Sequence, residues 1–563
     1  MSGPPILQIE SLSLSFGKNA NLVKVLHNID LELFPNEILG LVGESGSGKS
    51  VTSLAVMGLL GNNANLEGQI LYQGKDLAKL SQKQLRALRG KEIAMIFQEP
   101  MSALNPSIKC GPQVAEVLRI HLELSSESAK KRVLELFEEV KLPRVNEMYN
   151  SYPHQLSGGQ MQRVMIAMAL ACKPKVLIAD EPTTALDVTV QKEIIELLKS
   201  LQEENQMSIL FISHDLALVS EIADRVAVMY KGELLEVAET KTLFESPKDE
   251  YTKALLASRP DLDQRLKLLP TVDQLNTKEY KAEVVSPAMR ASRHKKIYTQ
   301  EPLLEIINLE KTYFGKAALF GKPKEVKAVN KVSFSVFEGE TLGLVGESGC
   351  GKSTLGKTIM HIEETTAGQI KFRGKDITNL NKDQLSQLRK EIQVVFQDPF
   401  ASLNPRMTIG SAISEPLEVH HKHSASKRKQ EVIQLLEQVG LDASYYNRYP
   451  HELSGGQRQR IGIARAIALK PKLLICDESV SALDISVQAQ VLNLLNELKE
   501  KYSFTYIFIS HDLAVVKYMA DQLVVMNAGE IEEIGDADEI YENPRKDYTK
   551  RLIDAIPKGL KKA

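Results

Sequence analysis

The sequence predicts an α/β protein in which one domain, built on a mainly parallel β-sheet, occurs twice. Two observations predict this class. Apolar strand-like runs alternate with helix-like runs along each half of the chain, and the same glycine-rich loop lies between a strand and a helix in both halves. A chain of 563 residues is also too long for a single hydrophobic core. We therefore expect two domains, each with parallel strands covered by helices on both sides.

Repeated motifs show the duplication. Ser157-Gly-Gly-Gln160 recurs 297 residues later at Ser454–Gln457, and Asp180-Glu181 recurs 297 residues later at Asp477-Glu478. A period this long indicates a duplicated domain, because solenoid repeats are far shorter.

The two copies set the expected domain boundaries. We place the first domain at residues 6–260 and the second at residues 303–557. Residues 261–302 have weak apolar periodicity, two prolines up to residue 300 and a basic cluster, which predicts a linker.

Strands and helices follow in the same order in each copy. Residues 7–10 and 12–16 alternate between apolar and polar with period two, as half-buried strands do. The apolar runs Ile38–Val42 and Leu342–Val345 predict buried strands, and residues 51–60 are compatible with a helix.

Between this strand and this helix, residues 43–50 and 346–353 fit the P-loop pattern G-x-x-x-x-G-K-[ST]. Its glycines let backbone N–H groups converge on a phosphate, and the helix N-terminus adds its positive dipole end. We expect Lys49 to reach the β- and γ-phosphates of a nucleotide and Ser50 to bind Mg²⁺. The residues expected to bind ATP here are Gly43, Glu44, Ser45, Gly46, Ser47, Gly48, Lys49, Ser50 and Val51, and in the second copy Gly346, Glu347, Ser348, Gly349, Cys350, Gly351, Lys352, Ser353 and Thr354.

The rest of each copy continues the alternation. After Gln98, a helical insert is predicted by apolar residues at helical spacing, namely Ala129, Val133, Leu136, Phe137 and Val140. Two apolar strands follow at residues 176–179 and 208–212. The helix between them has an apolar face made of Val190, Ile194, Leu197, Leu198 and Leu201.

Two polar motifs carry the predicted chemistry. The strand ending at residue 179 delivers Asp180 to a Mg²⁺ site and leaves Glu181 to orient and deprotonate a water, whereas solvated turn residues are the alternative. Residues 156–160, Leu-Ser-Gly-Gly-Gln, are a second glycine-rich helix start. It can offer N–H groups and a hydroxyl to a phosphate, and Ser157 can act simply as a helix N-cap.

Composition limits the partners. A net charge of −2 and a pI of about 6.6 give no electrostatic footprint for nucleic acid. Four cysteines without metal-binding spacing fit a reducing cytoplasm. No signal peptide is recognisable, and the apolar runs are shorter than the roughly 18 residues that a membrane span needs.

Taken together, these motifs resemble the ATPase domain of ABC transporters. The first copy contains Phe97-Gln98, Ala185-Leu-Asp187 and a lone His214 in addition to the motifs above, and the second copy contains Phe396-Gln397, Ala482-Leu-Asp484 and His511. Finer features are similar to the ATPases of peptide, nickel and glutathione importers, a group that includes the fused ATPases of microcin C and oligopeptide importers. These features are residues 97–106, their counterpart 396–405, and Tyr-Pro-His before each Leu-Ser-Gly-Gly-Gln motif.

The resemblance implies roles by position. As catalytic residues it implies Glu181 and Glu478 (general bases), His214 and His511 (γ-phosphate contacts), and Gln98 and Gln397. As Mg²⁺ ligands it implies Ser50, Gln98 and Asp180 in one site and Ser353, Gln397 and Asp477 in the other. To the ATP-binding residues it adds Phe16 and Tyr313, which would stack on adenine, and Ser157, Gly158, Gly159, Gln160, Ser454, Gly455, Gly456 and Gln457.

The resemblance also implies architecture and partners. It implies two tandem P-loop ATPase domains, each with a mainly parallel sheet core, an antiparallel N-terminal β part and a helical insert. They would pack head to tail as an intramolecular dimer in which each domain completes the ATP site of the other. The cofactors would be ATP and Mg²⁺, without an iron–sulfur cluster, because neither copy has the C-terminal cysteines of many relatives.

The expected partners are two transmembrane permease subunits and, through them, a solute-binding protein, with no nucleic acid. The chain would then be a peripheral protein on the cytoplasmic face of the bacterial inner membrane. The alternatives are a soluble tandem ABC ATPase that acts on ribosomes or nucleic acid, and the ATPase of an exporter. One departure is that Asp477-Glu478 is followed by Ser479 where Asp180-Glu181 is followed by Pro182. The change spares both carboxylates, so we expect hydrolysis at both sites, and it leaves open whether they are equally active.

Overall fold

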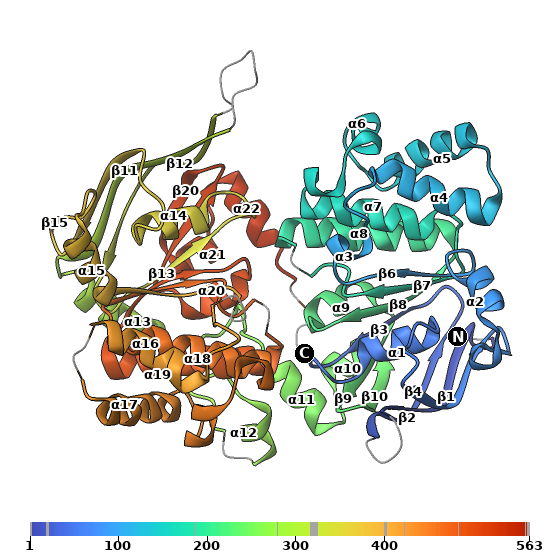
Figure 1. Cartoon of the computed structure of the whole chain (residues 1–563), viewed down its shortest axis with the longest axis horizontal. Helices are drawn as coiled ribbons and strands as arrows, with labels where there is room; N and C mark the ends of the chain where they lie inside the picture. Colours follow the sequence, from blue (N-terminus) through green and yellow to red (C-terminus); the bar gives the residue numbers. More distant parts are fainter. Residues whose placement is uncertain are drawn as a thin grey trace. The chain divides into compact units, whose positions relative to one another are not determined.

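The structure is a computed structural model of the whole chain (Figure 1). It describes residues 3–17, 22–184, 186–277, 280–315, 325–398, 402–420, 423–481, 483–557 and 559. Ala185, Ala482, Phe400 and Ala401, which belong to motifs discussed above, lie outside the described residues.

The described residues form two compact units. The first unit, domain 1 below, contains residues up to Leu256 together with Pro557 and Gly559. The second, domain 2, contains the described residues of Ala257–Ile556, so it includes the segment 261–302 for which the sequence predicts a linker.

Domain 1 has two β-sheets. Its antiparallel sheet has the order β2-β1-β4-β5, formed by β1 (Leu7–Phe16), β2 (Val23–Leu33), β4 (Ala64–Tyr72) and β5 (Lys75–Asp76). Its larger sheet has the order β10-β9-β3-β8-β7-β6, formed by β3 (Ile38–Val42), β6 (Ile93–Ile96), β7 (Val176–Asp180), β8 (Ser208–Ser213), β9 (Arg225–Tyr230) and β10 (Glu233–Glu239). Neighbouring strands of this sheet are parallel except at β10, which pairs antiparallel with β9.

The helices of domain 1 occupy the connections between these strands. They are α1 (Lys49–Val56), α2 (Gln82–Leu88), α3 (Pro100–Ala103), α4 (Cys110–Leu122), α5 (Ser126–Glu139), α6 (Val145–Asn150), α7 (Gly158–Leu170), α8 (Val188–Asn205), α9 (Leu216–Ile222), α10 (Thr240–Glu245) and α11 (Glu250–Ala257), with 3₁₀ turns at Leu77–Lys79 and Pro153–Gln155. The predicted helical insert is the group α3–α7, and Figure 1 shows α4–α6 at one end of the domain and the antiparallel sheet at the other.

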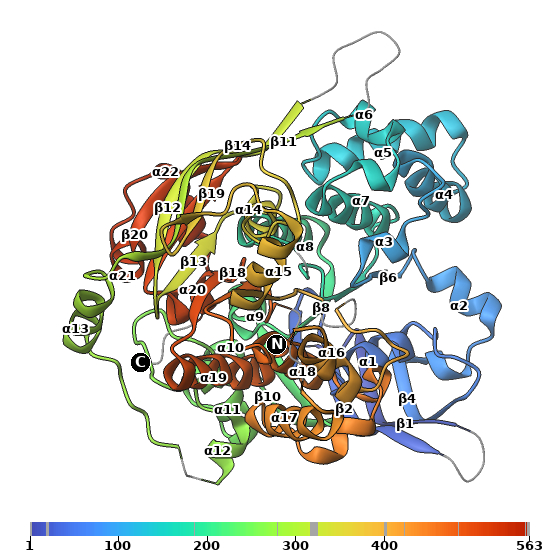
Figure 2. The same ribbon diagram turned by 60° about the vertical axis from the view of Figure 1, so that its left-hand side comes forward.

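Domain 2 repeats this plan. Its sheets have the orders β12-β11-β14-β15 and β16-β17-β18-β13-β19-β20. The strands are β11 (Pro302–Phe314), β12 (Glu325–Phe337), β13 (Thr341–Val345), β14 (Ala367–Phe372), β15 (Lys375–Asp376), β16 (Ile392–Val395), β17 (Leu473–Asp477), β18 (Thr505–Ile509), β19 (Gln522–Asn527) and β20 (Glu530–Asp536). Figure 2 shows β11, β12 and β14 well separated from helices α16 and α17 of its insert.

The helices of domain 2 begin before its first strand. They are α12 (Val272–Asn276), α13 (Pro287–Ile297), α14 (Lys352–Ile359), α15 (Lys382–Glu391), α16 (Ile409–His420), α17 (Ala425–Gln438), α18 (Gly455–Ile467), α19 (Ile485–Tyr502), α20 (Leu513–Met519), α21 (Ala537–Glu542) and α22 (Asp547–Asp554), with 3₁₀ turns at Ala443–Asn447 and Pro450–Glu452. Helices α12 and α13 lie within the predicted linker, whereas the described residues 3–6 that precede β1 are not helical.

The predicted fold class is confirmed. Parallel core strands, the antiparallel N-terminal sheet and the helical insert occur in both domains. Each domain has an apolar core between its two sheets, where side chains of β1 and β4 meet those of β3, α1 and β7 in domain 1. Among the described residues, no helix is both long and apolar enough to span a bilayer.

Candidate functional site

Both P-loops lie where a buried strand turns into a helix. In domain 1 the loop connects β3 to α1, and in domain 2 it connects β13 to α14. Gly43 has φ of 151°, and a Cβ atom there would lie 2.1 Å from the Met229 carbonyl oxygen, so only glycine fits. The equivalent Gly346 has φ of 147°, with the Met526 carbonyl 2.2 Å from the same position. Strand β9 or β19 therefore supports each loop closely from one side.

The P-loop lysines are bonded to the loops that carry them. Lys49 is buried, and its Nζ donates hydrogen bonds to the carbonyl oxygens of Gly43 and Glu44, both at 2.8 Å. Lys352 donates to those of Gly346 at 2.7 Å and Glu347 at 3.0 Å. A phosphate bound in the loop would attract these ammonium groups more strongly than neutral carbonyls do.

The predicted Mg²⁺ ligands on the helix and the acidic strand meet in both domains. Ser50, in the first turn of α1, donates its hydroxyl to Oδ1 of Asp180 at the end of β7, at 3.2 Å. In domain 2, Ser353 donates to Oδ1 of Asp477 at 3.0 Å. The sequence separates each pair by more than 120 residues, and the parallel order of the strands brings them together.

Glu181 is held in an unusual backbone conformation directly after β7. Its φ is 47°, a left-handed value that is uncommon for residues other than glycine. Its amide donates to the Ile212 carbonyl of β8 at 2.9 Å, which fixes the turn. Glu478 has φ of 48° and bonds to the Ile509 carbonyl in the same way. Strained backbone that the surrounding structure enforces is concentrated at functional sites.

Three side chains converge on one carboxylate oxygen of Glu181. Gln98 Nε2 donates to Oε2 at 2.9 Å, Thr184 Oγ1 donates to it at 2.8 Å, and His214 Nδ1 lies 3.2 Å from it. The sequence had indicated Gln98 and His214 for the site. It had not indicated Thr184, and the only available signal was its position in the turn three residues after Glu181.

The second site differs at this point. Gln397 Nε2 donates to Oε2 of Glu478 at 2.7 Å, and His511 Nδ1 lies 3.4 Å from that oxygen. Ser481, the counterpart of Thr184, instead donates to the backbone carbonyl of Glu478 at 2.9 Å. The Glu478 carboxylate therefore lacks the hydroxyl bond that Glu181 receives.

These contacts move the pKa values of neighbouring acids in opposite directions. Burial opposes ionisation of Glu181, but the hydrogen bond and charge of His214 and the bond from Thr184 outweigh it and lower its pKa to about 2. Burial raises the pKa of Asp180, assisted by the nearby charge of Glu181. In domain 2 the hydrogen bond of His511 lowers the pKa of Glu478 against the effect of burial, and burial raises the pKa of Asp477. Adjacent acids with diverging pKa values are typical of a catalytic site.

The Leu-Ser-Gly-Gly-Gln motifs start helices α7 and α18. Ser157 accepts a hydrogen bond from the Gln160 amide at 3.3 Å and Gln160 Oε1 accepts one from the Ser157 amide at 3.0 Å, which is a capping box. Ser454 and Gln457 form the same box. The N-cap expected for Ser157 is thus confirmed, and Ser157, Gly158, Ser454 and Gly455 are exposed.

The second glycine of each motif has a packing role. A Cβ atom on Gly159 would lie 2.6 Å from Val190 of α8, and one on Gly456 would lie 2.3 Å from Val487 of α19. The remaining predicted ATP contacts, Phe16 and Tyr313, lie near the ends of β1 and β11, and Tyr313 is exposed enough to stack on a base.

The residues at each P-loop suit a nucleotide and a hard cation. Ser47 in the first loop has a buried hydroxyl without a hydrogen-bond partner among the described residues, as expected of a group that awaits a phosphate. Hydroxyl, amide and carboxylate oxygens of Ser50, Gln98 and Asp180 are the donor types that Mg²⁺ prefers. Within the part of the chain that the structure describes, no cluster of three or more His, Cys, Asp or Glu side chains could hold a different metal.

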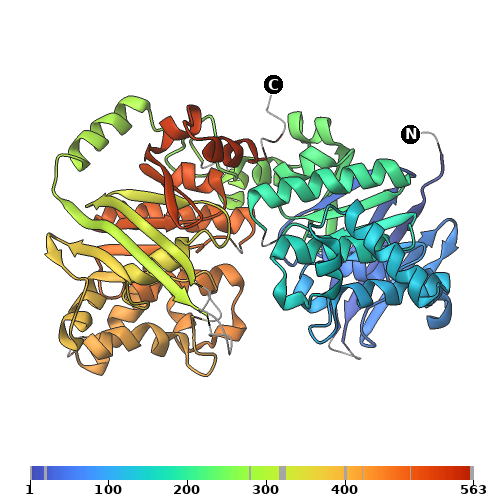
Figure 3. The same ribbon diagram turned by 90° about the horizontal axis from the view of Figure 1, so that it is seen from above.

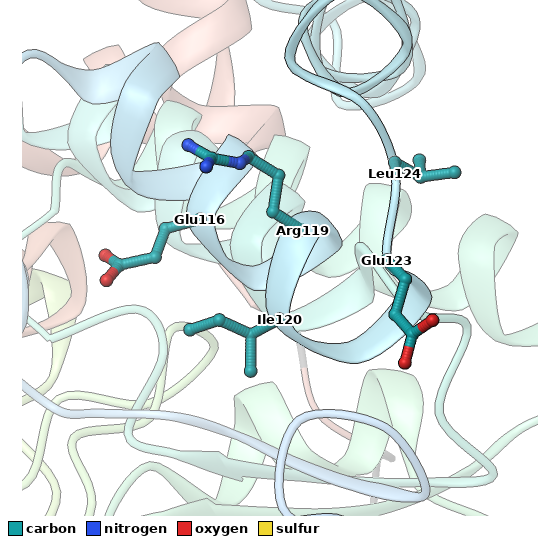
Figure 4. A pocket seen from close by; sticks show the side chains of 5 residues that line it. All are labelled: Glu116, Arg119, Ile120, Glu123 and Leu124. Carbon is teal, nitrogen blue, oxygen red and sulfur yellow. The ribbon is translucent and has the colours of Figure 1, made fainter.

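A surface pocket of about 410 Å³ lies away from these groups, on the helical insert of domain 1. It is lined by Glu116, Arg119, Ile120, Glu123 and Leu124, and Figure 4 shows Glu116, Arg119 and Ile120 projecting from the same helix, α4. The pocket shares no lining residue with the two P-loop sites.

Comparison with known proteins agrees with this geometry. A family model described as "ABC transporter" matches residues 26–184 and again residues 329–481, once in each domain. The chain belongs to the ABC transporter family. A second model, "Oligopeptide/dipeptide transporter, C-terminal region", matches residues 235–283 and 533–562. In each copy one match lies C-terminal to the strand that ends in the acidic residues, β7 in domain 1 and β17 in domain 2.

Curated relatives match almost the whole chain. The glutathione import ATP-binding protein GsiA of Escherichia coli K12 is 45% identical over 561 residues, which cover 98% of this chain and 89% of the relative. The protein of the same name from Pectobacterium atrosepticum is 43% identical over 565 residues with the same coverage. This chain is therefore an ATP-binding protein of the ABC family, with ATP hydrolase activity.

Among solved structures, cbiO1 from Clostridium perfringens, part of the ABC transporter complex cbiONQ, is 27% identical. The match covers 43% of this chain and 92% of that chain, with a TM-score of 0.39.

Proposed function

We propose that this chain is the energy-coupling ATPase of a bacterial importer for peptides or peptide-like solutes such as glutathione. The observation that carries the proposal is the presence, in both domains, of one complete constellation: a P-loop lysine, a Ser–Asp pair, and a glutamate bonded to Gln and His. The direction of transport and the solute class rest on the relatives, which are named glutathione import proteins, and on the oligopeptide-type C-terminal regions.

In the proposed reaction each side chain has a distinct task. Lys49 and Lys352 bind the phosphates, and the ionised carboxylates of Glu181 and Glu478 accept the proton of the attacking water. His214 and His511 orient those carboxylates and reach the γ-phosphate. Ser50, Gln98 and Asp180 hold Mg²⁺ in one site, and Ser353, Gln397 and Asp477 hold it in the other. When bound, Mg²⁺ would neutralise part of the negative charge of the phosphates.

We further propose that each ATP site is completed by the other domain. The exposed helix starts at Ser157 and Ser454 carry N–H groups and a hydroxyl that no phosphate of their own P-loop requires. In this arrangement the Ser454 loop serves the site of Lys49, and the Ser157 loop serves the site of Lys352. Phe16 and Tyr313 would stack on the two adenines.

The partners would be two permease subunits and, through them, a solute-binding protein, with the chain bound peripherally at the cytoplasmic face of the inner membrane. The insert of domain 1 offers a surface for such a partner. Phe97 is 38% exposed, Met101 on α3 is 52% exposed, and Ile120 beside the pocket in Figure 4 is 66% exposed. Under this proposal these side chains would contact the permease, and Phe97 directly precedes Gln98, whose amide bonds to Glu181.

The alternative is a tandem ABC ATPase that acts on ribosomes or nucleic acid. The relatives cited above are named as import proteins and give it no support. The net charge of −2 also gives the chain no overall positive charge that would attract a nucleic-acid backbone.

Purification of the tagged chain from membranes tests the proposal directly. Two permease subunits should co-purify with the wild-type chain, and reconstituted vesicles should take up labelled glutathione or an oligopeptide only with ATP. A Lys49→Ala/Lys352→Ala variant should retain the subunits but lose uptake. Recovery of the chain with ribosomes and without membrane proteins would favour the alternative.

A further inference from the structure

The predicted adenine contact of domain 2, Tyr313, has a cation over its ring. Strand β11 alternates its side chains between two faces, so Lys311 and Tyr313 lie on the same face. The Lys311 ammonium is 5.0 Å from the centre of the Tyr313 ring, which is within the range of a cation–π contact. Figure 3 shows β11 and β12 as long yellow-green strands, side by side in domain 2. Lys311 therefore contacts the ring that would receive the base.

The Lys311 ammonium is anchored by the turn between α14 and β14. Its Nζ lies 3.0 Å from Oε2 of Glu363 and donates to the Glu364 carbonyl at 2.9 Å. Only 12% of the Lys311 side chain is exposed, which is low for a lysine. Two oxygens and one aromatic ring thus fix the position of this ammonium group.

The turn is itself bonded to the strand that carries Tyr313. The Thr312 amide donates to Oγ1 of Thr366 at 2.9 Å, and the Thr366 amide donates to the Glu310 carbonyl at 2.8 Å. The turn follows α14, the helix that begins at the P-loop lysine, and α14 packs against β11. The phosphate-binding loop and the aromatic ring are therefore parts of one connected framework within domain 2.

Domain 1 has an apolar arrangement at the same place. The residue two positions before Phe16 is Leu14, which is fully buried and pairs with Leu66 of β4. Phe16, Leu60 and Leu66 pack against the core cluster that contains Leu14. Phe16 thus belongs to an apolar cluster, whereas Tyr313 is paired with an ammonium group.

The order of the Tyr313 ring matters for binding a base. Tyr313 is 37% exposed near the end of its strand, where an aromatic side chain can turn out into solvent. The cation opposes such motion because it attracts one face of the ring. The opposite face stays available for stacking, and a ring that is already ordered loses less conformational entropy when a base binds.

We propose that Lys311 is a positioning residue for the ATP base at the second site. Its ammonium, held by Glu363, keeps the Tyr313 ring in the orientation that stacks on adenine. Lys311 acts through the ring and does not contact the nucleotide. Base recognition is then supported by a charge in domain 2 and by apolar packing in domain 1. This role of Lys311 rests on the proposed function, in which Tyr313 stacks on adenine.

A double-mutant cycle on the full-length chain tests this role. Lys49→Ala removes the phosphate contact of the first site, so that calorimetric titration with ATP measures the second site. In this background Tyr313→Ala should weaken ATP binding on the order of tenfold, because the stacking surface is lost. Lys311→Leu, which introduces the residue type found in domain 1, should weaken it about fivefold. With Tyr313 already replaced by alanine, Lys311→Leu should have no further effect, because no ring remains to be held.

Two control variants separate positioning from a general loss of charge or stability. Lys311→Arg should bind ATP as the wild type does, since a guanidinium also stacks on an aromatic ring and pairs with a carboxylate. Lys375→Leu removes an exposed lysine from β15, at the edge of the same sheet, and should leave the affinity unchanged. An equal loss on Lys311→Leu with and without the Tyr313 ring would show a structural role only and would overturn the inference. Wild-type affinity of Lys311→Leu would overturn it as well.

Two other results would separate the ring from the ATP site itself. Unchanged affinity of Tyr313→Ala would exclude the ring as the base contact and the role of Lys311 with it, while ATP binding through Lys352 would still support the proposed function. Absence of ATP binding in the Lys49→Ala background would contradict the second ATP site, and Lys311 would then position no base.

Discussion

Gln98 and Glu181 are joined by a hydrogen bond of 2.9 Å between the amide nitrogen of one and the carboxylate of the other. The same bond joins Gln397 to Glu478 at 2.7 Å. In this conformation the amide precedes the helical insert and at the same time contacts the proposed base. A partner that displaced the insert would therefore change how the carboxylate is held. Burial raises the pKa of Glu181, but His214, Thr184 and Lys49 outweigh burial and lower it to about 2, so the Gln98 bond bears on the orientation of the carboxylate.

Replacement of Glu181 or Glu478 by Gln should lower hydrolysis about 10²- to 10⁴-fold at the altered site, because the amide cannot accept the proton. Affinity for ATP should remain, since the side-chain shape is kept. Phosphate release and equilibrium binding of a fluorescent ATP analogue measure the two quantities. A wild-type rate for Glu478→Gln beside an inactive Glu181→Gln would show that only the first site works.

Thr184→Val should lower the rate of the first site about tenfold at unchanged ATP affinity, because Glu181 loses a charged hydrogen bond that helps to orient it. Thr184→Ser should restore the rate. Ser481→Ala is the matched control, since that hydroxyl bonds to a backbone carbonyl. Measured in backgrounds that inactivate the other site, equal losses for Thr184→Val and Ser481→Ala would refute a specific role for Thr184.

Ser157→Arg should impair hydrolysis at the site of Lys352 and spare that of Lys49, if each domain completes the site of the other. The added side chain blocks the exposed helix start that would face the partner's phosphate. Single-site backgrounds with Glu181→Gln or Glu478→Gln separate the two rates. Loss confined to the site of Lys49 would contradict the head-to-tail pairing.

Met101→Asp and Ile120→Asp should abolish uptake while leaving basal hydrolysis within about twofold, because a charge on an apolar docking surface disfavours the permease. Val237→Asp, at an exposed apolar position of β10, is the control and should transport normally. Uptake and ATPase activity in reconstituted vesicles give both quantities. Normal uptake by the insert variants would place the docking surface elsewhere.

The segment 261–300, which carries His294, should make domain 2 sensitive to alkaline pH, because His294 lies 3.3 Å from both Asp521 and Asp536. Burial disfavours the charged form of His294, but its bonds to Asp521 and Asp536 outweigh this and raise its pKa. A raised folded-state pKa contributes stability that is complete below the unfolded value of about 6.5 and is lost as pH rises through the folded value. Arg290, Arg293 and Tyr298 complete the surroundings of the imidazole.

The melting midpoint should therefore fall between pH 6 and pH 9 more in the wild type than in His294→Gln. For a domain of about 250 residues, each kcal/mol of lost unfolding free energy lowers the midpoint by a few degrees. Differential scanning calorimetry at matched ionic strength provides the measurement. His121→Gln, which alters a histidine of domain 1, should leave the pH dependence of domain 2 as in the wild type. Identical pH profiles for the wild type and His294→Gln would contradict this role of His294.

Local sequence patterns were sufficient for the core of the site. The apolar runs around residues 38–42 and 176–179 predicted parallel strands, and parallel strands end at one edge, which is why Ser50 and Asp180 meet. The spacing of motifs does not show which atoms of two side chains are in contact. The sequence indicated that Gln98 belongs to the site, and the structure shows that its amide nitrogen donates to Glu181. Its role as a metal ligand stays a prediction.

The packing of the segment 261–300 on domain 2 could not be predicted from the sequence for a different reason. Its docking depends on polar contacts between residues far apart in the chain, such as Arg290 with Asp536 across 246 positions. A helix with few apolar residues gives no periodic signal, and a single sequence does not reveal which distant acid a basic residue contacts. The same limit applies to Tyr298 and Glu340, because nothing near Glu340 in the sequence indicates that the Tyr298 hydroxyl donates to it.

The segment 261–300 also bears on where such a gene can be divided. If the coding sequence were split in two between residues 257 and 261, the downstream product would keep Arg290, Arg293 and His294 beside Asp521 and Asp536. A split at residue 302 would leave a basic tail on the upstream protein and remove these partners from the acids of the downstream one, where Lys499 still pairs with Asp521. The breakpoint directly before the second repeat is thus the less viable one. Natural or laboratory fission of this chain should favour the position between residues 257 and 261.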